Sequence, residues 1–135
     1  MLRKALIGLL AFTAIDAAFA GEECNPATFN SHAEQIDCEL HQAQLVSREV
    51  DAAFASVKAA NARFEKIPGT KPGLFTSWID DDQKQWRAWI AEDCQLQGEV
   101  TMGTAGADVE AQCLQDGYLQ RVKALNQLAR TLDLP

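Results

Sequence analysis

The chain of 135 residues carries 19 acidic and 12 basic side chains, which gives a formal net charge of −7. Nucleic acids and anionic membrane surfaces bind proteins through basic faces, so this composition argues against both as partners. The length suits one domain of ordinary size.

The first 20 residues have the organisation of a secretory signal peptide. Arg3 and Lys4 form a basic start, an apolar run follows over residues 5–14, and the Ala-Phe-Ala sequence at residues 18–20 fits a cleavage site. The apolar run is shorter than the roughly 20 residues of a membrane-spanning helix. We therefore expect one mature domain over residues 21–135, in which the loss of Arg3, Lys4 and Asp16 leaves a net charge of 10 − 18 = −8.

The cysteines all lie in the expected mature part, at Cys24, Cys38, Cys94 and Cys113. An even number of cysteines after an export signal indicates two disulfides formed in an oxidising compartment. No two of them form the close pair that a zinc site uses, so we expect no metal site. Residues 21–23 separate the cleavage site from Cys24, so we expect no lipid anchor and a periplasmic or secreted protein.

A long first helix is predicted from Ser31 to Lys66. Residues 27–67 contain no glycine or proline, and Ser31 with Glu34 fits a capping box. Apolar residues recur there at steps of three and four, which is the period of an amphipathic helix: Ile36, Leu40, Ala43, Val46, Val50, Ala53, Phe54, Val57, Ala60 and Phe64.

A second helix is predicted after two Pro-Gly steps at residues 68–73, with Thr76 or Ser77 as its cap, and it runs towards Gly98. Its three tryptophans fall at helical spacing, and we expect them in the core: Trp78, Trp86 and Trp89. We interpret the acidic run at residues 80–82 as a solvated helix start. The alternative, a cation site, lacks the spaced oxygen ligands and the central glycine of a calcium loop.

A third helix is predicted from Asp108, as its cap, to Leu132. Gly98, Gly103 and Gly106 are expected to interrupt the helices before it. No segment alternates with period two for long enough to predict a strand. The fold class is therefore all-α, a small disulfide-stapled bundle of three main helices with a long first helix.

An antiparallel hairpin of the second and third helices would bring Cys94 close to Cys113, and Cys24 could fold back on Cys38. We predict these two disulfides. The alternative pairing Cys38–Cys94 would instead join the first helix to the second.

The sequence contains no recognisable catalytic or cofactor motif. The histidines, His32 and His41, fall on different faces of the first helix, and neither a C-x-x-C-H haem motif nor a G-x-S-x-G elbow occurs. The glycine-containing stretch at residues 103–106 lacks the lysine of a P-loop. We predict a protein that is not an enzyme and that uses no cofactor.

The second and third helices carry a motif that resembles the lysozyme inhibitor LprI-like N-terminal domain family, which comprises small exported bacterial domains. The resemblance spans residues 24–125 and rests on the matching positions Gln83, Trp86, Trp89, Cys94, Gly103, Thr104, Cys113 and Arg121. The chain departs from the family where a common Arg-Asp pair is replaced by Ile90 and Ala91. It also departs where an Asp-x-x-Leu-Asn-x-x-Tyr stretch is replaced by Ser47, Val50, Asp51 and Phe54.

The resemblance implies an exported protein-binding domain that inhibits lysozyme. The alternative is a structural or adaptor module of the cell envelope that binds another envelope protein. A lysozyme cleft presents two carboxylates, so a cation such as Lys71 on the proline-rich turn is the preferred contact. The loop between the second and third helices offers only backbone amides and the hydroxyls of Thr101 and Thr104. In the simplest alternative, Lys71 is only a solvated loop lysine.

Overall fold

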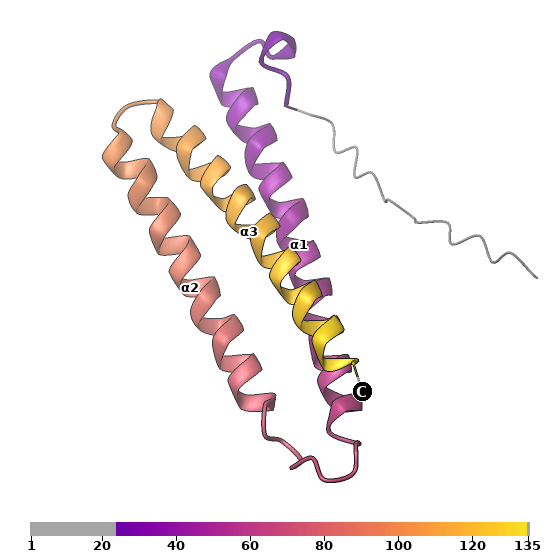
Figure 1. The fold of residues 1–135 in the computed structure, drawn as a ribbon. Coiled ribbons are helices and arrows are strands. Elements are labelled where there is room, and N and C mark those ends of the chain that lie inside the picture. The colour runs from indigo at the N-terminus through magenta and orange to yellow at the C-terminus, as the bar shows by residue number, and fades with distance from the viewer. Residues whose placement is uncertain (1–23, 135) are drawn as a thin grey trace, which may run out of the picture.

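The computed structural model describes residues 24–134 and consists of helices. A short 3-10 helix, η1 (Pro26–Thr28), precedes α1 (His32–Phe64), α2 (Thr76–Thr101) and α3 (Ala105–Leu132) (Figure 1). The predicted all-α class and the three main helices are confirmed. The expected signal peptide, residues 1–20, lies outside the described residues. No helix formed by the described residues is long and apolar enough to cross a membrane.

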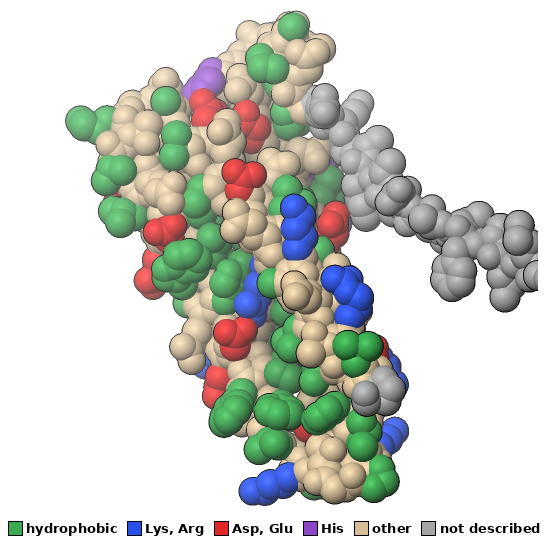
Figure 2. Space-filling view, in the orientation of Figure 1, with side chains coloured by type: hydrophobic (Ala, Val, Ile, Leu, Met, Phe, Trp, Pro, Cys, Tyr) green, Lys and Arg blue, Asp and Glu red, His purple; other side chains and the backbone are tan. Residues whose placement is uncertain are grey.

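The three helices lie roughly side by side, with α3 between α1 and α2 (Figure 1). Helix α3 packs extensively against both neighbours, whereas α1 and α2 touch each other at few places. The buried cluster comprises Val50, Ala53, Val57 and Leu125, from α1 and α3. Helix α2 is consequently an edge helix, and hydrophobic side chains remain visible at the surface along it (Figure 2).

The start of α1 matches the sequence prediction closely. The Ser31 hydroxyl accepts a hydrogen bond from the Glu34 amide at 3.2 Å, as an N-cap residue does. The Glu34 carboxylate reaches back one residue further than a capping box requires and accepts from the Asn30 amide at 2.8 Å. The helix ends at Phe64, two residues before the predicted end.

The predicted cap of α2 is wrong, although the helix begins at Thr76. Phe75 occupies the N-cap position, and no side chain caps the helix. The Thr76 hydroxyl instead donates to a Glu65 carboxylate oxygen at 3.1 Å. This hydroxyl therefore joins the end of α1 to the start of α2.

The predicted break between α2 and α3 is too wide, because Gly98 and Gly106 both lie inside helices. A Cβ atom on Gly98 would lie 2.8 Å from the Gly106 carbonyl oxygen, and a Cβ on Gly106 would lie 2.5 Å from that of Gly98. These two glycines permit close approach of the helix backbones. Helix α3 begins at Ala105, and Asp108 lies in its first turn, so the prediction of Asp108 as its cap is wrong.

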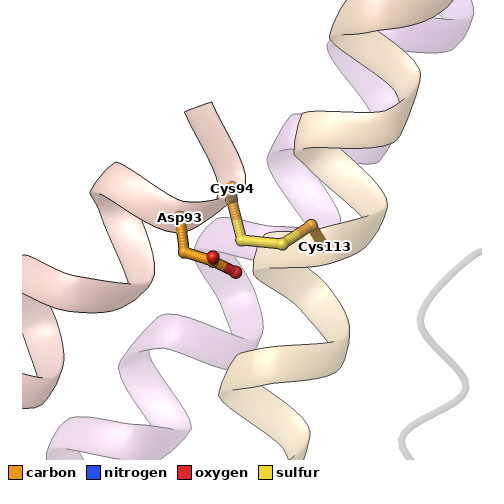
Figure 3. Close-up of side chains that lie close together, drawn as sticks. All are labelled: Asp93, Cys94 and Cys113. Atoms are coloured by element: carbon orange, nitrogen blue, oxygen red, sulfur yellow. A yellow bond between two sulfur atoms is a disulfide. The ribbon is translucent and has the colours of Figure 1, made fainter. Parts of the chain in front are cut away.

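Both predicted disulfides are present, Cys24–Cys38 and Cys94–Cys113. The first fastens the segment before α1 onto that helix, and the second joins α2 to α3 (Figure 3). Asp93 lies beside the second disulfide, and the potential ligand atoms of the three residues lie within 4.8 Å of one another. Metal binding by cysteine requires thiolates, and these bonded sulfurs are not thiolates.

Candidate functional site

Apart from the two cysteines of the second disulfide, the residues of the recognised motif separate into three places. Gln83, Trp86 and Arg121 meet between α2 and α3 in the middle of the bundle. Gly103 and Thr104 form the turn between these helices, and Trp89 points outward from α2 with 57% of its surface exposed. The motif therefore does not form one compact site.

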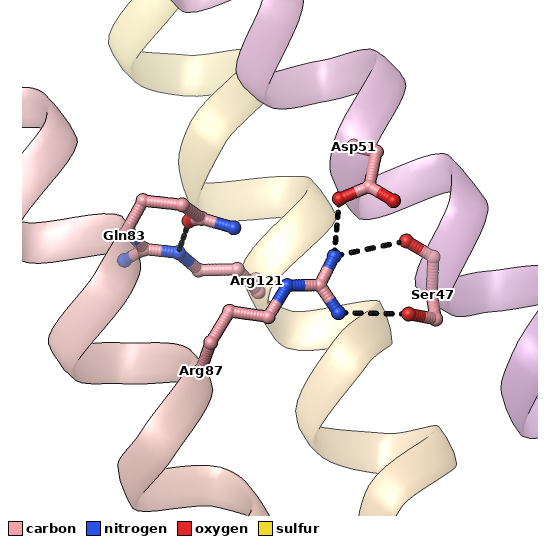
Figure 4. A network of polar contacts seen from close by, with 5 residues as sticks. All are labelled: Ser47, Asp51, Gln83, Arg87 and Arg121. Atoms are coloured by element: carbon pink, nitrogen blue, oxygen red, sulfur yellow. Dashed lines mark hydrogen bonds and ion pairs between the residues drawn. The ribbon is translucent and has the colours of Figure 1, made fainter.

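Arg121 is the one charged residue of the motif, and its side chain is only 14% exposed. Its Nε donates to the Gln83 side-chain oxygen at 3.0 Å (Figure 4), and a terminal nitrogen donates to Asp82 at 2.5 Å. The guanidinium carbon lies 5.0 Å from the centre of a Trp86 ring. The pair is enclosed on the Arg121 side only, because the Asp82 side chain is 67% exposed, and these contacts join α3 to α2.

Arg87, which the sequence analysis did not single out, connects α2 to α1. It donates to the Ser47 hydroxyl at 2.7 Å, to the Ser47 carbonyl oxygen at 3.2 Å and to an Asp51 carboxylate oxygen at 2.5 Å (Figure 4). Ser47 and Asp51 lie one helical turn apart on α1, in the stretch that departs from the family pattern. Two features of the sequence point to this contact: Ser47 and Asp51 are four residues apart, and Arg87 lies between Trp86 and Trp89.

The aromatic rings extend this network. Trp86 and Tyr118 lie with their ring centres 5.9 Å apart, and the Arg87 guanidinium lies 5.8 Å from the Trp86 ring and 5.6 Å from the Tyr118 ring. Cation–π contacts of this kind contribute roughly 0.5–1 kcal/mol at exposed positions. The two arginines and the two rings thus form a brace across all three helices.

The prediction that three tryptophans fill the core is wrong for two of them. Trp86 is half-buried, but 66% of Trp78 and 57% of Trp89 are exposed. The physical reason is the position of α2 at the edge of the bundle, where no further helix covers its outer face.

Ile90 stands where the family pattern has an arginine, and it makes an apolar contact with α3. It is 4% exposed, and its Cδ1 lies 2.5 Å from the position that a Cβ on Gly117 would occupy. Gly117 therefore allows Ile90 to pack directly against the α3 backbone. The neighbouring Ala91 is exposed.

The acidic run at the start of α2 is exposed to solvent, as predicted, with the Asp80 and Asp82 side chains 46% and 67% exposed, but these two residues also form ion pairs. Asp80 pairs with Lys58 at 3.1 Å, and Asp82 pairs with Arg121, whereas Asp81 is exposed. Two of these three carboxylates therefore join α2 to its neighbours.

The described residues show one histidine–carboxylate pair, between His32 Nε2 and Asp108 at 2.7 Å. A hydrolytic site would also need a nucleophile hydrogen-bonded to the histidine. Within residues 24–134, neither His32 nor His41 is hydrogen-bonded to a hydroxyl or a thiol. This pair joins the start of α1 to the start of α3.

The three expected partner-contact residues lie at opposite ends of the molecule. Lys71 is exposed in the connection between α1 and α2, while Thr101 and Thr104 lie at the far end of α2, a helix about 39 Å long at 1.5 Å per residue. The Thr101 hydroxyl donates to the Gln97 carbonyl oxygen within its own helix. Lys71 and the two threonines cannot all contact one narrow cleft.

Hydrogen bonds at the Lys71 end fix the connection between α1 and α2. The Gly73 backbone amide, together with the Asn61 and Thr76 side chains, donates to Glu65 and lowers the pKa of that carboxyl. Gly69 and Gly73 have φ angles of +92° and +73°, which suit glycine in turns.

Arg63 and Asp133 join the end of α1 to the end of α3. The Arg63 guanidinium donates twice to the Asp133 carboxylate, each time at 2.9 Å. These hydrogen bonds lower the pKa of the Asp133 carboxyl and raise the pKa of the Arg63 guanidinium.

An apolar hollow of about 290 Å³ opens at the same end as Lys71. Asp82 and Arg121 supply its polar edge. The apolar lining comes from all three helices and from the residue just before α2: Phe54, Phe75, Trp78, Ile79, Leu125, Leu128 and Leu132. Figure 2 shows hydrophobic side chains gathered over this lower end of the molecule.

Comparison with known proteins identifies one family. Residues 24–125 match the family model described as Lysozyme inhibitor LprI. No curated protein and no solved structure matches the chain significantly.

Proposed function

The chain belongs to the lysozyme inhibitor LprI family, and from this premise we propose that it is an exported inhibitor that binds lysozyme and performs no catalysis of its own. The match over residues 24–125 is the observation that carries the proposal. The two disulfides support an extracytoplasmic location, because such bonds form and persist in oxidising compartments. An acidic inhibitor would also be steered towards a cationic enzyme.

We assign the contact with lysozyme to the end that carries Lys71. The lysine is exposed, and the bonds from Gly73 and Thr76 to Glu65 order the connection before binding, which lowers the entropy lost in the complex. The apolar hollow beside Phe75 and Trp78 adds area that a partner can bury. A lysine placed between the two carboxylates of the enzyme would compete with substrate.

An inhibition assay with the oxidised protein tests this assignment. Lys71→Ala is expected to raise the inhibition constant by more than about tenfold, the loss expected of a charge-assisted contact. Thr104→Ala is expected to have a smaller effect. Lys123→Ala is the matched control, because Lys123 is an exposed lysine of α3 with no ion pair within the described chain.

Two results would count against the proposal in different ways. Equal inhibition by the Lys71→Ala variant and the unmodified protein would move the contact to the Thr104 turn or to a helix face. Binding without inhibition at equimolar protein would exclude the inhibitor function itself.

A second candidate function is that of an adaptor module of the cell envelope. The exposed Trp89 favours it, since this large apolar side chain lies on the outside of α2, away from the Lys71 connection. A pull-down from periplasmic extract, followed by the same experiment with Trp89→Ser, discriminates this candidate from lysozyme binding. Loss of a captured envelope protein with lysozyme inhibition unchanged would support the adaptor.

A further inference from the structure

Helix α2 carries an apolar stripe along its solvent-exposed side. Trp78, Trp89, Leu96 and Val100 are each between 57% and 69% exposed. With 3.6 residues per turn, these positions fall within a sector of about 40° and extend for about 33 Å along the helix. We call these four residues the α2 stripe.

No helix of the described chain covers the α2 stripe, although the Trp78 ring at one end lies 6.0 Å from the Phe75 ring. The residues that pack against the rest of the bundle lie beyond one edge of the stripe on the helical wheel, Trp86 at about 40°, Ile90 at about 80° and Cys94 at about 120° from that edge. The outer face of a surface helix is normally polar. A helix that is apolar on its exposed face as well is typical of a protein with an interaction site there.

The unpaired charges of α2 beside the α2 stripe all have one sign, whereas Asp82, which falls within the sector of the stripe, is paired with Arg121 of α3. Asp81, Glu92, Asp93 and Glu99 lie within about 60° of it on the helical wheel, and none of them forms an ion pair within residues 24–134. Asp93 and Glu99 accept hydrogen bonds only from neutral glutamine side chains. Figure 2 shows acidic and hydrophobic side chains together along the α2 edge, with the basic side chains in this view mainly over α3 and at the lower end.

The two basic residues of α2 do not alter this balance. Arg87 points to α1 and binds Ser47 and Asp51, and Lys84 lies about 120° from the α2 stripe on the helical wheel. The face therefore combines large apolar anchors with uncompensated negative charge.

We propose that the α2 stripe docks a basic amphipathic helix of another protein. Apolar residues at helical spacing on such a segment would pack on the two tryptophans, Leu96 and Val100, and its flanking Lys or Arg side chains would meet the four carboxylates. The hollow beside Trp78 would accept one apolar side chain from the end of the bound helix. A second copy of the chain would place like charges opposite each other, and an anionic membrane would be repelled for the same reason. The α2 stripe does not include Lys71, so this interaction can be tested separately from lysozyme inhibition, although the hollow beside Trp78 adjoins both surfaces.

Binding of synthetic peptides to the full, oxidised protein tests the proposal. The probe is a helix-forming peptide of about 20 residues with leucines on one face and lysines beside them, long enough to cover the stripe. Two comparison peptides replace the lysines by glutamates or the leucines by serines. We expect the basic apolar peptide to bind at least about tenfold more tightly than either, with affinity falling as salt rises from about 50 to 500 mM.

Variants at exposed positions separate docking from folding. Trp89→Ser with Leu96→Ser is expected to weaken peptide binding at least about tenfold, with Leu40→Ser and Leu119→Ser together as a matched control on α1 and α3. Glu92→Lys with Glu99→Lys is expected to weaken binding about fivefold or more, whereas Asp37→Lys on α1 is not. Circular dichroism checks that every variant stays helical.

Several outcomes would overturn the proposal. The first is that the basic peptide does not bind at about 100 µM. The second is that the acidic peptide binds as tightly as the basic one, and the third is that the Trp89/Leu96 variant binds the basic peptide with unchanged affinity. Dimerisation of the unmodified protein that this variant abolishes would assign the face to a second copy instead. Failure of lysozyme inhibition with peptide binding intact would leave this inference in place and remove only the proposed function.

Discussion

The contact between Ile90 and Gly117 makes a quantitative test of how α2 packs on α3. In the unmodified protein, a Cβ added by Gly117→Ala would lie 2.5 Å from Ile90 Cδ1 and 3.0 Å from its Cγ1. Alanine stabilises a helix interior by about 0.8–1.0 kcal/mol relative to glycine. Overpacking a closed core costs about 1–3 kcal/mol. We therefore expect Gly117→Ala to lower the free energy of unfolding by about 0–2 kcal/mol, the difference of these two effects.

The same substitution should have the opposite sign when Ile90 is shortened. Ile90→Ala alone creates a cavity at a residue that is 4% exposed and should cost about 2–5 kcal/mol. In that background the alanine at position 117 meets free space, so it should stabilise the protein by about 1 kcal/mol. The coupling free energy between the two positions is then about 1–3 kcal/mol.

Equilibrium unfolding in urea, followed by circular dichroism with the disulfides intact, measures all four proteins of this cycle. Gly73→Ala is not a suitable control because its φ is positive, so Ala107→Gly, at an exposed position of α3, serves to calibrate helix propensity. Additive effects of the two substitutions, within about 0.5 kcal/mol, would refute the inferred packing of Ile90 on the α3 backbone.

Three further predictions concern the contacts of Arg87 with α1, the loss of stability at low pH and the second disulfide. Arg87→Met is expected to lower the free energy of unfolding by about 1–3 kcal/mol, because the guanidinium bonds to α1 are lost, while Lys84→Met stays within about 0.5 kcal/mol in the same urea assay. The pKa values of Glu65 and Asp133 are lowered by folding, so their stabilising contributions are complete above the unfolded pKa values and disappear as pH falls through the folded ones. NMR titration should show the Asp133 pKa returning towards its ordinary value in Arg63→Gln. Replacing Cys94 and Cys113 by serine together should cost about 3 kcal/mol in the chain-entropy model, and a thermal melt unchanged by that replacement would contradict it.

The helices and the disulfide pairing could be predicted because they depend on local signals. The Ser31 hydroxyl caps the start of α1, proline and glycine at residues 68–73 keep that helix from continuing into α2, and helix direction alone brings Cys94 to Cys113. The glycines near the second turn were misinterpreted for a physical reason. Gly98 and Gly106 are suited both to breaking a helix and to close helix contact, and only the partner backbone decides between these roles.

The environment of α2 could not be predicted, because it depends on how many helices surround it. A tryptophan at helical spacing predicts burial when each face of the helix has a neighbour. Here α1 and α3 lie on one side of α2, so Trp86 is covered, whereas Trp78 and Trp89 remain exposed. The same arrangement explains why Arg87 was missed, since its partners Ser47 and Asp51 are distant in sequence and are brought near only by the packing of all three helices.

The family motif and the surfaces that could meet a partner are therefore largely different sets of residues. Gln83, Trp86 and Arg121 use their polar and aromatic groups on one another and on neighbouring helices, which leaves little of them free for a ligand. Lys71 and Leu96, in contrast, make few contacts within the described chain and remain free to bind. A chain could keep the motif, and with it the fold, while a few surface substitutions changed its partner. Thr104, in the exposed turn, and Trp89 are motif residues for which this separation fails, and because Trp89 is exposed on α2, its substitution should alter partner binding far more than stability.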